Sequence, residues 1–498
     1  MSTKTGKAVM TKNKQDADRG KPTLASLARE VLDTVPTFPD AEGEAYARIG
    51  ESVMPMRSST FLSWLSDQLT SKHPALTISK RTLEDAIFTA ISVARQKPPQ
   101  AVFVRSAYVS NKVFFDCGNN YIEASEDGVK VLPSPAPVNF VRPKGWLPID
   151  MSNSQGNLDD FFSLLNVADS DRVLLWGFLA YVAANGLGVK DFPIVIFSGE
   201  QGSGKSMGAR LLRQLLDPSK AGLSSPFSSE RDLCIMAKYN AILAFDNLDK
   251  ITAEDSNMLC RLSGGVGLSA RMLYTDAELM VFNEARPAIL TGITIEAWRG
   301  DLASRSISIR LDPIEAKARQ EKSDLNEQFA TIHAGALLDL MESVAAGLRH
   351  AGEPAQILGR LADFEGFCQR AALEHETYEP NAFVVAYKAN QDATTANVLD
   401  DDLFVRNLAY STRNGFKGTP SELLASLPPL TTKLPAGVFY PQTSKSLGHN
   451  LMRIAPSLRT LGWQVEPYKG HERGWLIKPP APKSVEDKVD ARLGGYTD

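Results

Sequence analysis

The segment from residue 199 to residue 206 constrains the fold of this chain more than any other feature. It fits the P-loop pattern, in which glycines, a lysine and a hydroxyl stand at fixed spacing to hold phosphate groups. Glycine lets backbone N–H groups approach phosphate oxygens, and the N-terminus of the following helix favours negative charge. The segment predicts binding of a nucleoside triphosphate, against the alternative of an ordinary surface loop. Its residues are Gly199, Glu200, Gln201, Gly202, Ser203, Gly204, Lys205 and Ser206.

The flanking sequence strengthens this prediction. Residues 193–197 form a short apolar run that is typical of a buried strand. Residues 207–216 have helical spacing, with Leu211, Leu212 and Leu215 on one face. Strand, glycine loop and helix are the setting that the pattern requires.

Polar residues follow two further apolar runs. Residues 241–245 end at Asp246, and residues 288–290 end at Thr291; a fourth apolar run covers 307–311. Strands that alternate with helices predict a parallel α/β sheet with its ligands at the carboxyl ends of the strands. We therefore expect a P-loop NTPase core, followed by a helical lid region.

The N-terminal part is predicted to be a separate α+β domain. Stretches with helical spacing come first, and short β-rich runs separated by turns follow between residues 101 and 141. The proline-punctuated stretch 133–148 is interpreted as a linker or boundary. The predicted helices cover 24–32, 58–69 and 81–95.

The C-terminal segment is basic, with ten Lys/Arg and three Asp/Glu between residues 404 and 480. A helix is expected over 443–454, then a short helical turn that starts at Pro456, and then two strands around a turn. This is the layout of a winged helix, a DNA-binding module. A solvated face or a protein partner is the alternative explanation of the charge. The residues expected to contact DNA phosphates are Lys445, Arg453, Arg459, Lys469 and Arg473.

The expected divisions of the chain follow from these patterns. They are a disordered tail (1–21), an N-terminal α+β domain (22–149), a P-loop ATPase core (150–324), a helical lid region (325–400), a winged-helix DNA-binding domain (401–480) and a polar tail (481–498).

Composition bounds the cellular setting. The chain has 498 residues, 43% of them hydrophobic and 22% charged, as in ordinary globular proteins. Its four cysteines lie far apart, which argues against a zinc ribbon or a disulfide framework and favours the cytoplasm. The longest apolar run, residues 173–189, contains Asn185 and three glycines, so we interpret it as a buried helix and expect no membrane role.

The P-loop predicts the chemistry of its own residues. Lys205 would contact the β- and γ-phosphates of ATP, and Ser206 would be a ligand of Mg²⁺. Asp246 would hold the same Mg²⁺ from the end of its strand, with a helix N-cap as the alternative role. Asn247 follows where many ring ATPases have a second acid, and an amide orients water without accepting its proton. The water-activating base is therefore left open, with Asp249 close by.

Three further residues are candidates for the same site. Thr291 is placed to sense the γ-phosphate, or is simply a buried strand-end threonine. Arg305 precedes a strand and could act as an arginine finger on a neighbouring subunit's nucleotide, with Arg299 and Arg310 as competitors. Arg271 begins a predicted hairpin that could grip DNA in a ring's pore, or it is a salt-bridged core arginine.

Several short motifs occur in one order along the chain. After the P-loop come Phe245-Asp246-Asn247, a run from 259 to 276 that contains Gly-Gly and Arg-x-Leu-Tyr-Thr-Asp, Arg286-Pro287, and the segment from Asp301 to Arg305. Together they resemble the ATPase module of phage- and plasmid-type primase-helicases, which are related to superfamily 3 helicases of the AAA+ class. The similarity covers roughly residues 95 to 385.

The resemblance implies a hexameric, ATP-driven DNA helicase or a replication-initiator ATPase of a mobile element. Its DNA would be single-stranded or forked, and a separate primase or polymerase could be a partner, because no primase module is recognisable upstream. Lys205, Ser206, Asp246 and Arg305 fall on the family's nucleotide-site positions. Thr291 departs from the asparagine that is usual there. The alternatives are a nucleotide-switched initiator and an antiviral-defence ATPase, both without unwinding activity.

Overall fold

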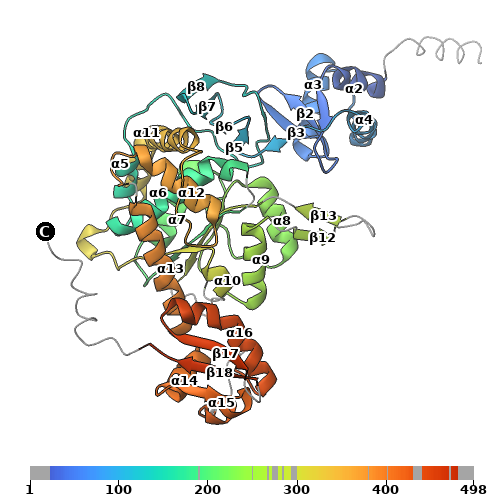
Figure 1. The fold of residues 1–498 in the computed structure, drawn as a ribbon. Coiled ribbons are helices and arrows are strands. Elements are labelled where there is room, and N and C mark those ends of the chain that lie inside the picture. The colour runs from blue at the N-terminus through green and yellow to red at the C-terminus, as the bar shows by residue number, and fades with distance from the viewer. Residues whose placement is uncertain are drawn as a thin grey trace, which may run out of the picture. The chain divides into compact units, whose positions relative to one another are not determined.

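The structure is a computed structural model of the full chain. It describes residues 23–188, 191–248, 251–265, 268–271, 279–282, 285–292, 300–379, 381–400, 402–429, 440–469 and 473–480, so both predicted tails lie outside the described residues. Two compact units are present (Figure 1). The first comprises 1–107, 114–123 and 130–150, and the second comprises 108–113, 124–129 and 151–498.

The first unit contains the three predicted helices, which pack around one apolar core. Phe61, Leu65 and Leu69 are fully buried in it. Ser58 caps the second helix, because its side chain accepts a hydrogen bond from the Phe61 amide. The helices are α2 (Leu24–Asp33), α3 (Ser59–Lys72) and α4 (Lys80–Ala94).

The expected order of helices first and strands afterwards is wrong. Three short antiparallel strands lie between α2 and α3 and pair in the order β1-β2-β3. At three to five residues each, they are too short for the period-two pattern to stand out. The strands of the N-terminal region are β1 (Thr37–Pro39), β2 (Ala45–Ile49), β3 (Ser52–Pro55), β4 (Val102–Phe103), β5 (Ser106–Val109), β6 (Lys112–Asp116), β7 (Asn120–Ser125), β8 (Gly128–Pro133) and β9 (Asn139–Phe140).

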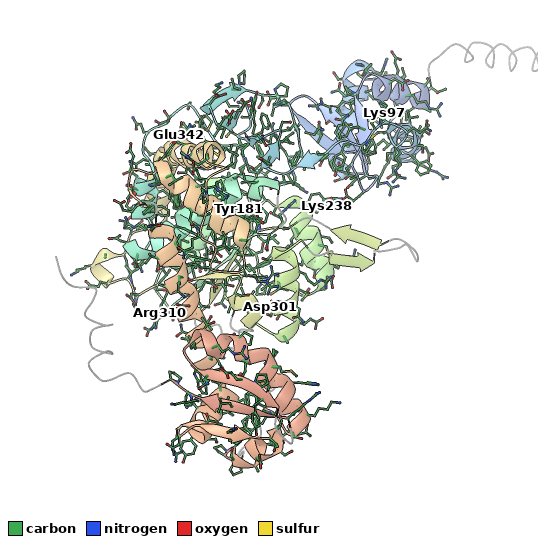
Figure 2. All side chains as sticks on the ribbon, in the orientation of Figure 1. Lys97, Tyr181, Lys238, Asp301, Arg310 and Glu342 are labelled. Carbon is green, nitrogen blue, oxygen red and sulfur yellow. The ribbon has the colours of Figure 1, made fainter. Side chains whose placement is uncertain are left out.

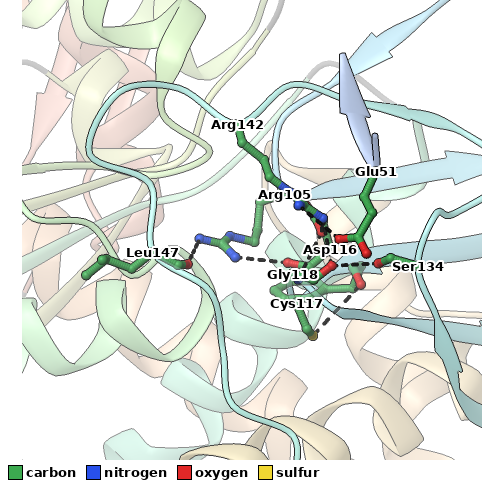
Figure 3. Close-up of polar contacts among 9 residues, drawn as sticks. Glu51, Arg105, Asp116, Cys117, Gly118, Ser134, Arg142 and Leu147 are labelled. Carbon is green, nitrogen blue, oxygen red and sulfur yellow. Dashed lines mark hydrogen bonds and ion pairs between the residues drawn. The ribbon is translucent and has the colours of Figure 1, made fainter. Parts of the chain in front are cut away.

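The proline-punctuated stretch 133–148 is packed into the first unit and ends just before its last residue, so it marks a boundary and is not a linker. Arg142 donates to both carboxylate oxygens of Asp116, at 2.9 and 2.8 Å (Figure 3). Arg105 donates to the carbonyl oxygens of Asp116 and Leu147. The two guanidinium groups also lie 4.3 and 4.9 Å from the centre of the Trp146 ring, as cation–π partners. Prolines here fix turns in an ordered segment.

A parallel four-stranded sheet forms the centre of the second unit and confirms the predicted α/β core. Its strand order is β11-β14-β10-β15, and every described pair in it is parallel. Three of the strands are largely apolar runs, as is typical of a buried parallel sheet, whereas β15 alternates polar and apolar residues. They are β10 (Ile194–Ser198), β11 (Leu243–Phe245), β14 (Ala288–Gly292) and β15 (Ser306–Arg310).

A predicted hairpin also forms between α9 and β14. Its strands, β12 (Leu268–Arg271) and β13 (Leu279–Phe282), are antiparallel. The first strand ends at Arg271, where the prediction had it start. The side chain of Arg271 is not described, so its proposed grip on DNA stays a prediction.

The helices of this unit account for its remaining core. The apolar run that starts at Val173 begins in α6, where Trp176 and Tyr181 are fully buried. Tyr181 is labelled in Figure 2. Among the described helices, α11 is long and apolar enough to cross a membrane, but 61% of its most apolar window is buried, as in a core helix. The helices are α5 (Leu158–Ser163), α6 (Asp169–Ala183), α7 (Lys205–Leu216), α8 (Glu230–Tyr239), α9 (Ala253–Ser263), α10 (Gly300–Ala303), α11 (Lys322–Arg349), α12 (Ala362–Ala371) and α13 (Ala382–Asp400).

The C-terminal segment has its own apolar core and a three-stranded antiparallel sheet of order β16-β18-β17. The prediction of a separate helical turn at Pro456 is wrong, because a single helix continues through this residue. Proline costs that helix a hydrogen bond, but Ile454, Ala455 and Leu458 are buried on both sides of it. The elements are α14 (Leu403–Thr412), β16 (Phe416–Gly418), α15 (Pro420–Ser426), α16 (Ser444–Thr460), β17 (Gln464–Lys469) and β18 (Arg473–Lys478).

Candidate nucleotide site

The P-loop connects the end of β10 to the start of α7, as predicted. Gly199, Gly202 and Gly204 all have positive φ angles (145°, 85° and 86°), which glycine adopts without strain. A side chain at Gly199 would also lie 2.3 Å from the Leu311 carbonyl oxygen. The loop therefore needs glycine for its conformation and, at Gly199, for space.

The Lys205 ammonium is folded back over this loop. It donates to the carbonyl oxygens of Gly199 and Glu200, both at 2.7 Å. Burial lowers the pKa of Lys205 from its ordinary value, and the nearby Asp246 carboxylate opposes that shift. The Lys205 ammonium therefore lies where the phosphate oxygens of a nucleotide would replace the two carbonyl oxygens as hydrogen-bond acceptors.

Ser206, Asp246 and Thr291 form the centre of the site. Ser206 Oγ donates to Asp246 Oδ1 at 2.7 Å, and Thr291 Oγ1 donates to the same oxygen at 2.5 Å. The carboxylate directly follows β11 and the threonine lies near the end of the neighbouring β14, so the sheet itself brings them together. A hydroxyl and one carboxylate fit Mg²⁺, which usually takes few protein ligands and completes its shell with water and phosphate.

Asn247 follows Asp246 in a left-handed conformation, with φ of 59°. Its amide N–H donates to Thr291 Oγ1 at 3.0 Å, and the Leu248 amide donates to the Thr291 carbonyl at 2.7 Å. Asparagine tolerates this conformation better than most residues. Thr291 is thus tied both to Asp246 and to the residue after it, while Asp249 lies outside the described residues.

Arg305 lies at the amino ends of the strands, whereas the P-loop follows the carboxyl end of β10. The Arg305 carbonyl accepts from the Ile194 amide at the start of β10, on the order of 13 Å from the end of that strand. The guanidinium forms an ion pair with Asp191 at 3.0 Å. Burial raises the pKa of Asp191, and Arg305 opposes the shift. Arg305 therefore does not reach the nucleotide site of its own chain.

Two side chains that sequence reasoning missed hold or face the P-loop. Asn166 Nδ2 donates to the carbonyls of Ser203 and Asp312, at 3.0 and 2.7 Å. Arg319 lies next to Gly202, where an added Cβ would be 3.2 Å from its Nη2. Both contacts join distant segments, so no local pattern signals them. Of the competing arginines, Arg310 ends β15 and is exposed (Figure 2), and Arg299 lies outside the described residues.

The predicted DNA-contacting residues lie on α16 and on the two strands that follow it. Lys445 is exposed, whereas Arg453 donates to Asn450 Oδ1 at 2.8 Å. Arg459 Nε donates to the Val465 carbonyl at 2.8 Å, although the residue is exposed. Arg473 is exposed at the start of β18. Lys469 ends β17, and its side chain is not described.

Fold and site together have the parallel sheet, glycine loop and helix that the P-loop pattern predicts. Residues 158–397 match the family model of the actinomycete integrative conjugative element replication protein, and residues 404–488 match the model of the RepA C-terminal domain of the same elements. The two ranges together cover well over half of the chain. Over both ranges the chain is similar to this family, and the coarser expectation of a replication protein of a mobile element is confirmed.

Solved structures give a weaker comparison. The "SCCmec type IV Cch - active helicase" structure is 13% identical, with a TM-score of 0.38 over 75% of this chain and 76% of that one. The apo C-terminal region of NrS-1 is also 13% identical, with a TM-score of 0.41 over 91% of this chain and 98% of that one. Scores this low carry no argument about function. No curated protein sequence matches the chain.

Proposed function

We propose that this protein is an ATP-driven motor that moves along or unwinds DNA during replication of its conjugative element. The observation that carries the proposal is the contact of Ser206 and Thr291 with one carboxylate oxygen of Asp246, directly beside the P-loop. This arrangement supplies a magnesium ligand pair and a polar link to a neighbouring strand. Bound ATP·Mg²⁺ would supply the phosphate anhydride whose hydrolysis drives the motor.

The protein residues divide the work by position. Lys205 would exchange its two carbonyl acceptors for phosphate oxygens and offset their charge. Ser206 and Asp246 would hold the metal against the phosphates. The Thr291 hydroxyl contacts the Asp246 carboxylate and the Asn247 amide. Thr291 would therefore transmit a change at Asp246 to the Asn247 backbone.

Hydrolysis would form a bond from a water oxygen to the γ-phosphorus and break the bond from that phosphorus to the bridging oxygen. ADP would leave with the bonding electrons, and the water proton would pass to phosphate or solvent. The Asn247 side chain could orient the water but not take its proton.

DNA binding is assigned to the C-terminal segment. The order helix, strand, helix, helix and two strands, over 403–478, is that of a winged helix, and its exposed basic residues suit a phosphate backbone. We further propose a hexameric ring, by resemblance, in which Arg305 would serve the neighbouring subunit's nucleotide and Arg271 would face the pore. Arg305 would have to exchange its ion pair with Asp191 for that contact.

Strand displacement tests the proposal. A forked DNA duplex with ATP and Mg²⁺ should be unwound by the wild-type chain and not by Lys205→Ala. Lys80→Ala is the matched control, because Lys80 is an exposed helix lysine of the first unit, paired with Glu84. Equal unwinding by wild type and Lys205→Ala would overturn the motor.

A nucleotide-switched initiator is the second candidate, and the asparagine at position 247 favours it. An amide next to Asp246 suits binding and sensing of ATP better than fast turnover. Tight ATP·Mg²⁺ binding with negligible DNA-stimulated hydrolysis would favour the initiator over the motor.

A further inference from the structure

A basic cleft adjoins Ser206 and Asp246, the proposed metal ligands, and Lys205 is not among its described lining residues. Its volume is about 720 Å³, within the usual range of ligand clefts, and Ser206 and Asp246 form part of its wall. Arg210, Lys220 and Lys322 also line it, whereas Asp246 is the one carboxylate among the described lining residues. The cleft therefore carries a net positive charge beside the place where the γ-phosphate would be cleaved.

The cations of this cleft are available to a ligand. None of the three forms an ion pair with another residue in the described part of the chain. Arg210 follows Ser206 by one helical turn on α7, and its Nε is buried with no hydrogen-bond partner among the described residues. A buried donor without an acceptor is costly, so an anion that reached it would be stabilised.

The opposite wall of the cleft is held in place by the sheet. The Ser224 amide donates to the Ala244 carbonyl at 2.8 Å, and the Asp246 amide donates to the Ser224 carbonyl at 2.9 Å. Ser224 and its neighbours thus extend the edge of β11 and present hydroxyl groups to the cleft. Hydroxyls and cations on a fixed frame are donors suited to a phosphate anion.

We propose that this cleft is a binding site for inorganic phosphate, which receives the γ-phosphate after hydrolysis; the assignment rests on the proposed ATPase function. The leaving phosphate moves away from the β-phosphate, and thus away from the P-loop, past Asp246. Arg210, Lys220 and Lys322 offset the repulsion from that carboxylate. Phosphate release is then a step separate from ADP release.

Product inhibition tests the assignment in the full-length chain. ADP formation from ATP·Mg²⁺ is followed while inorganic phosphate or ADP is added. Arg210→Gln and Lys322→Gln should each raise the phosphate concentration for half-inhibition roughly tenfold, the worth of one charge-assisted hydrogen bond. The ADP inhibition constant should change less than about twofold on the same scale. Lys322→Arg should keep phosphate inhibition, and Lys80→Gln serves as the remote control.

Three results would overturn the assignment. First, phosphate inhibition could be unchanged in both variants. Second, the inhibition constants of phosphate and ADP could rise together, which is the result expected if these cations belong to the nucleotide site itself. Third, a single-stranded oligonucleotide could instead displace phosphate and lose affinity in the same variants, which would make the cleft a DNA-backbone site. If the chain binds ATP but does not hydrolyse it, the motor fails while calorimetric titration of phosphate into the ADP·Mg²⁺ complex still tests the cleft.

Discussion

Asp116 in the first unit and Asp246 in the second are both carboxylates at the end of a strand, yet their surroundings differ. Asp116 is 1% exposed and accepts two hydrogen bonds from the Arg142 guanidinium and one from the Gly118 amide (Figure 3). Asp246 accepts from two neutral hydroxyls and borders an open cleft. The first charge is neutralised by its own chain, and the second is the one that we propose to bind a metal.

We propose that this difference separates a structural carboxylate from a functional one. Removing the Arg142 cation leaves the Asp116 carboxylate buried without its ion-pair partner, which lowers the stability of the fold. Removing the charge of Asp246 costs the fold little, because neutral partners remain, but it removes a metal ligand. The comparison therefore predicts opposite effects of substitutions at the two places.

The largest effect is expected for Asp246→Asn. Turnover of ATP should fall roughly a hundredfold or more, because the metal loses its carboxylate ligand and the amide carries no charge. The free energy of unfolding should change by less than about 1 kcal/mol. Steady-state hydrolysis and urea unfolding measure the two quantities, and a large loss of stability with normal turnover would reverse the comparison.

Arg142→Leu should have the next largest effect, and on stability. The buried Asp116 carboxylate would lose its cation, at a cost of roughly 3 kcal/mol in the free energy of unfolding of the first unit. Urea unfolding of the full chain reports this cost. The double variant Asp116→Asn with Arg142→Leu should recover part of it, and an unchanged single variant would show that the pair is not structural.

Thr291→Val should have a moderate effect on activity. The substitution keeps the shape of the side chain but removes its bonds to Asp246 and to the Asn247 amide. A loss of turnover of roughly tenfold is expected, equivalent to one hydrogen bond near a charge. Thr291→Ser, which keeps the hydroxyl, is the control. Equal turnover by Thr291→Val and the wild type would show that Thr291 has no role in the site.

The smallest effect concerns a third carboxylate, Asp171, which has neither cation nor metal assigned to it. Burial raises its pKa to about 6. Between pH 3.8 and about 6 the unfolded chain loses this proton while the folded chain keeps it, so Asp171 lowers stability as pH rises through that window. Asp171→Asn should therefore be more stable than wild type at pH 7 by roughly 1 kcal/mol and equal to it at pH 4. Urea unfolding at both pH values checks this, and an equal difference at both would exclude titration of Asp171.

The sequence allowed prediction of the features that depend on neighbours in the chain. The P-loop, its flanking strand and helix, and the strand ends at Asp246 and Thr291 follow from local apolar runs and glycine spacing. The contact between Asp246 and Thr291 does not follow from them, because it requires β14 to lie next to β11 although the two residues are 45 positions apart in the chain.

The failures have the same physical origin. Asn166 and Arg319 reach the P-loop from distant segments, so no periodicity marks them. The short strands β1–β3 are held by pairing and core packing and not by propensity. Pro456 stays inside α16 because tertiary burial on both sides outweighs the lost hydrogen bond.

The dependence of ATP affinity on Mg²⁺ tests most directly whether Asp246 is a metal ligand. Equilibrium titrations of ATP into the wild type and into Asp246→Asn are compared with Mg²⁺ and with chelator. We predict that Mg²⁺ strengthens binding roughly tenfold or more in the wild type and hardly at all in the variant. An equal gain in both proteins would contradict the account.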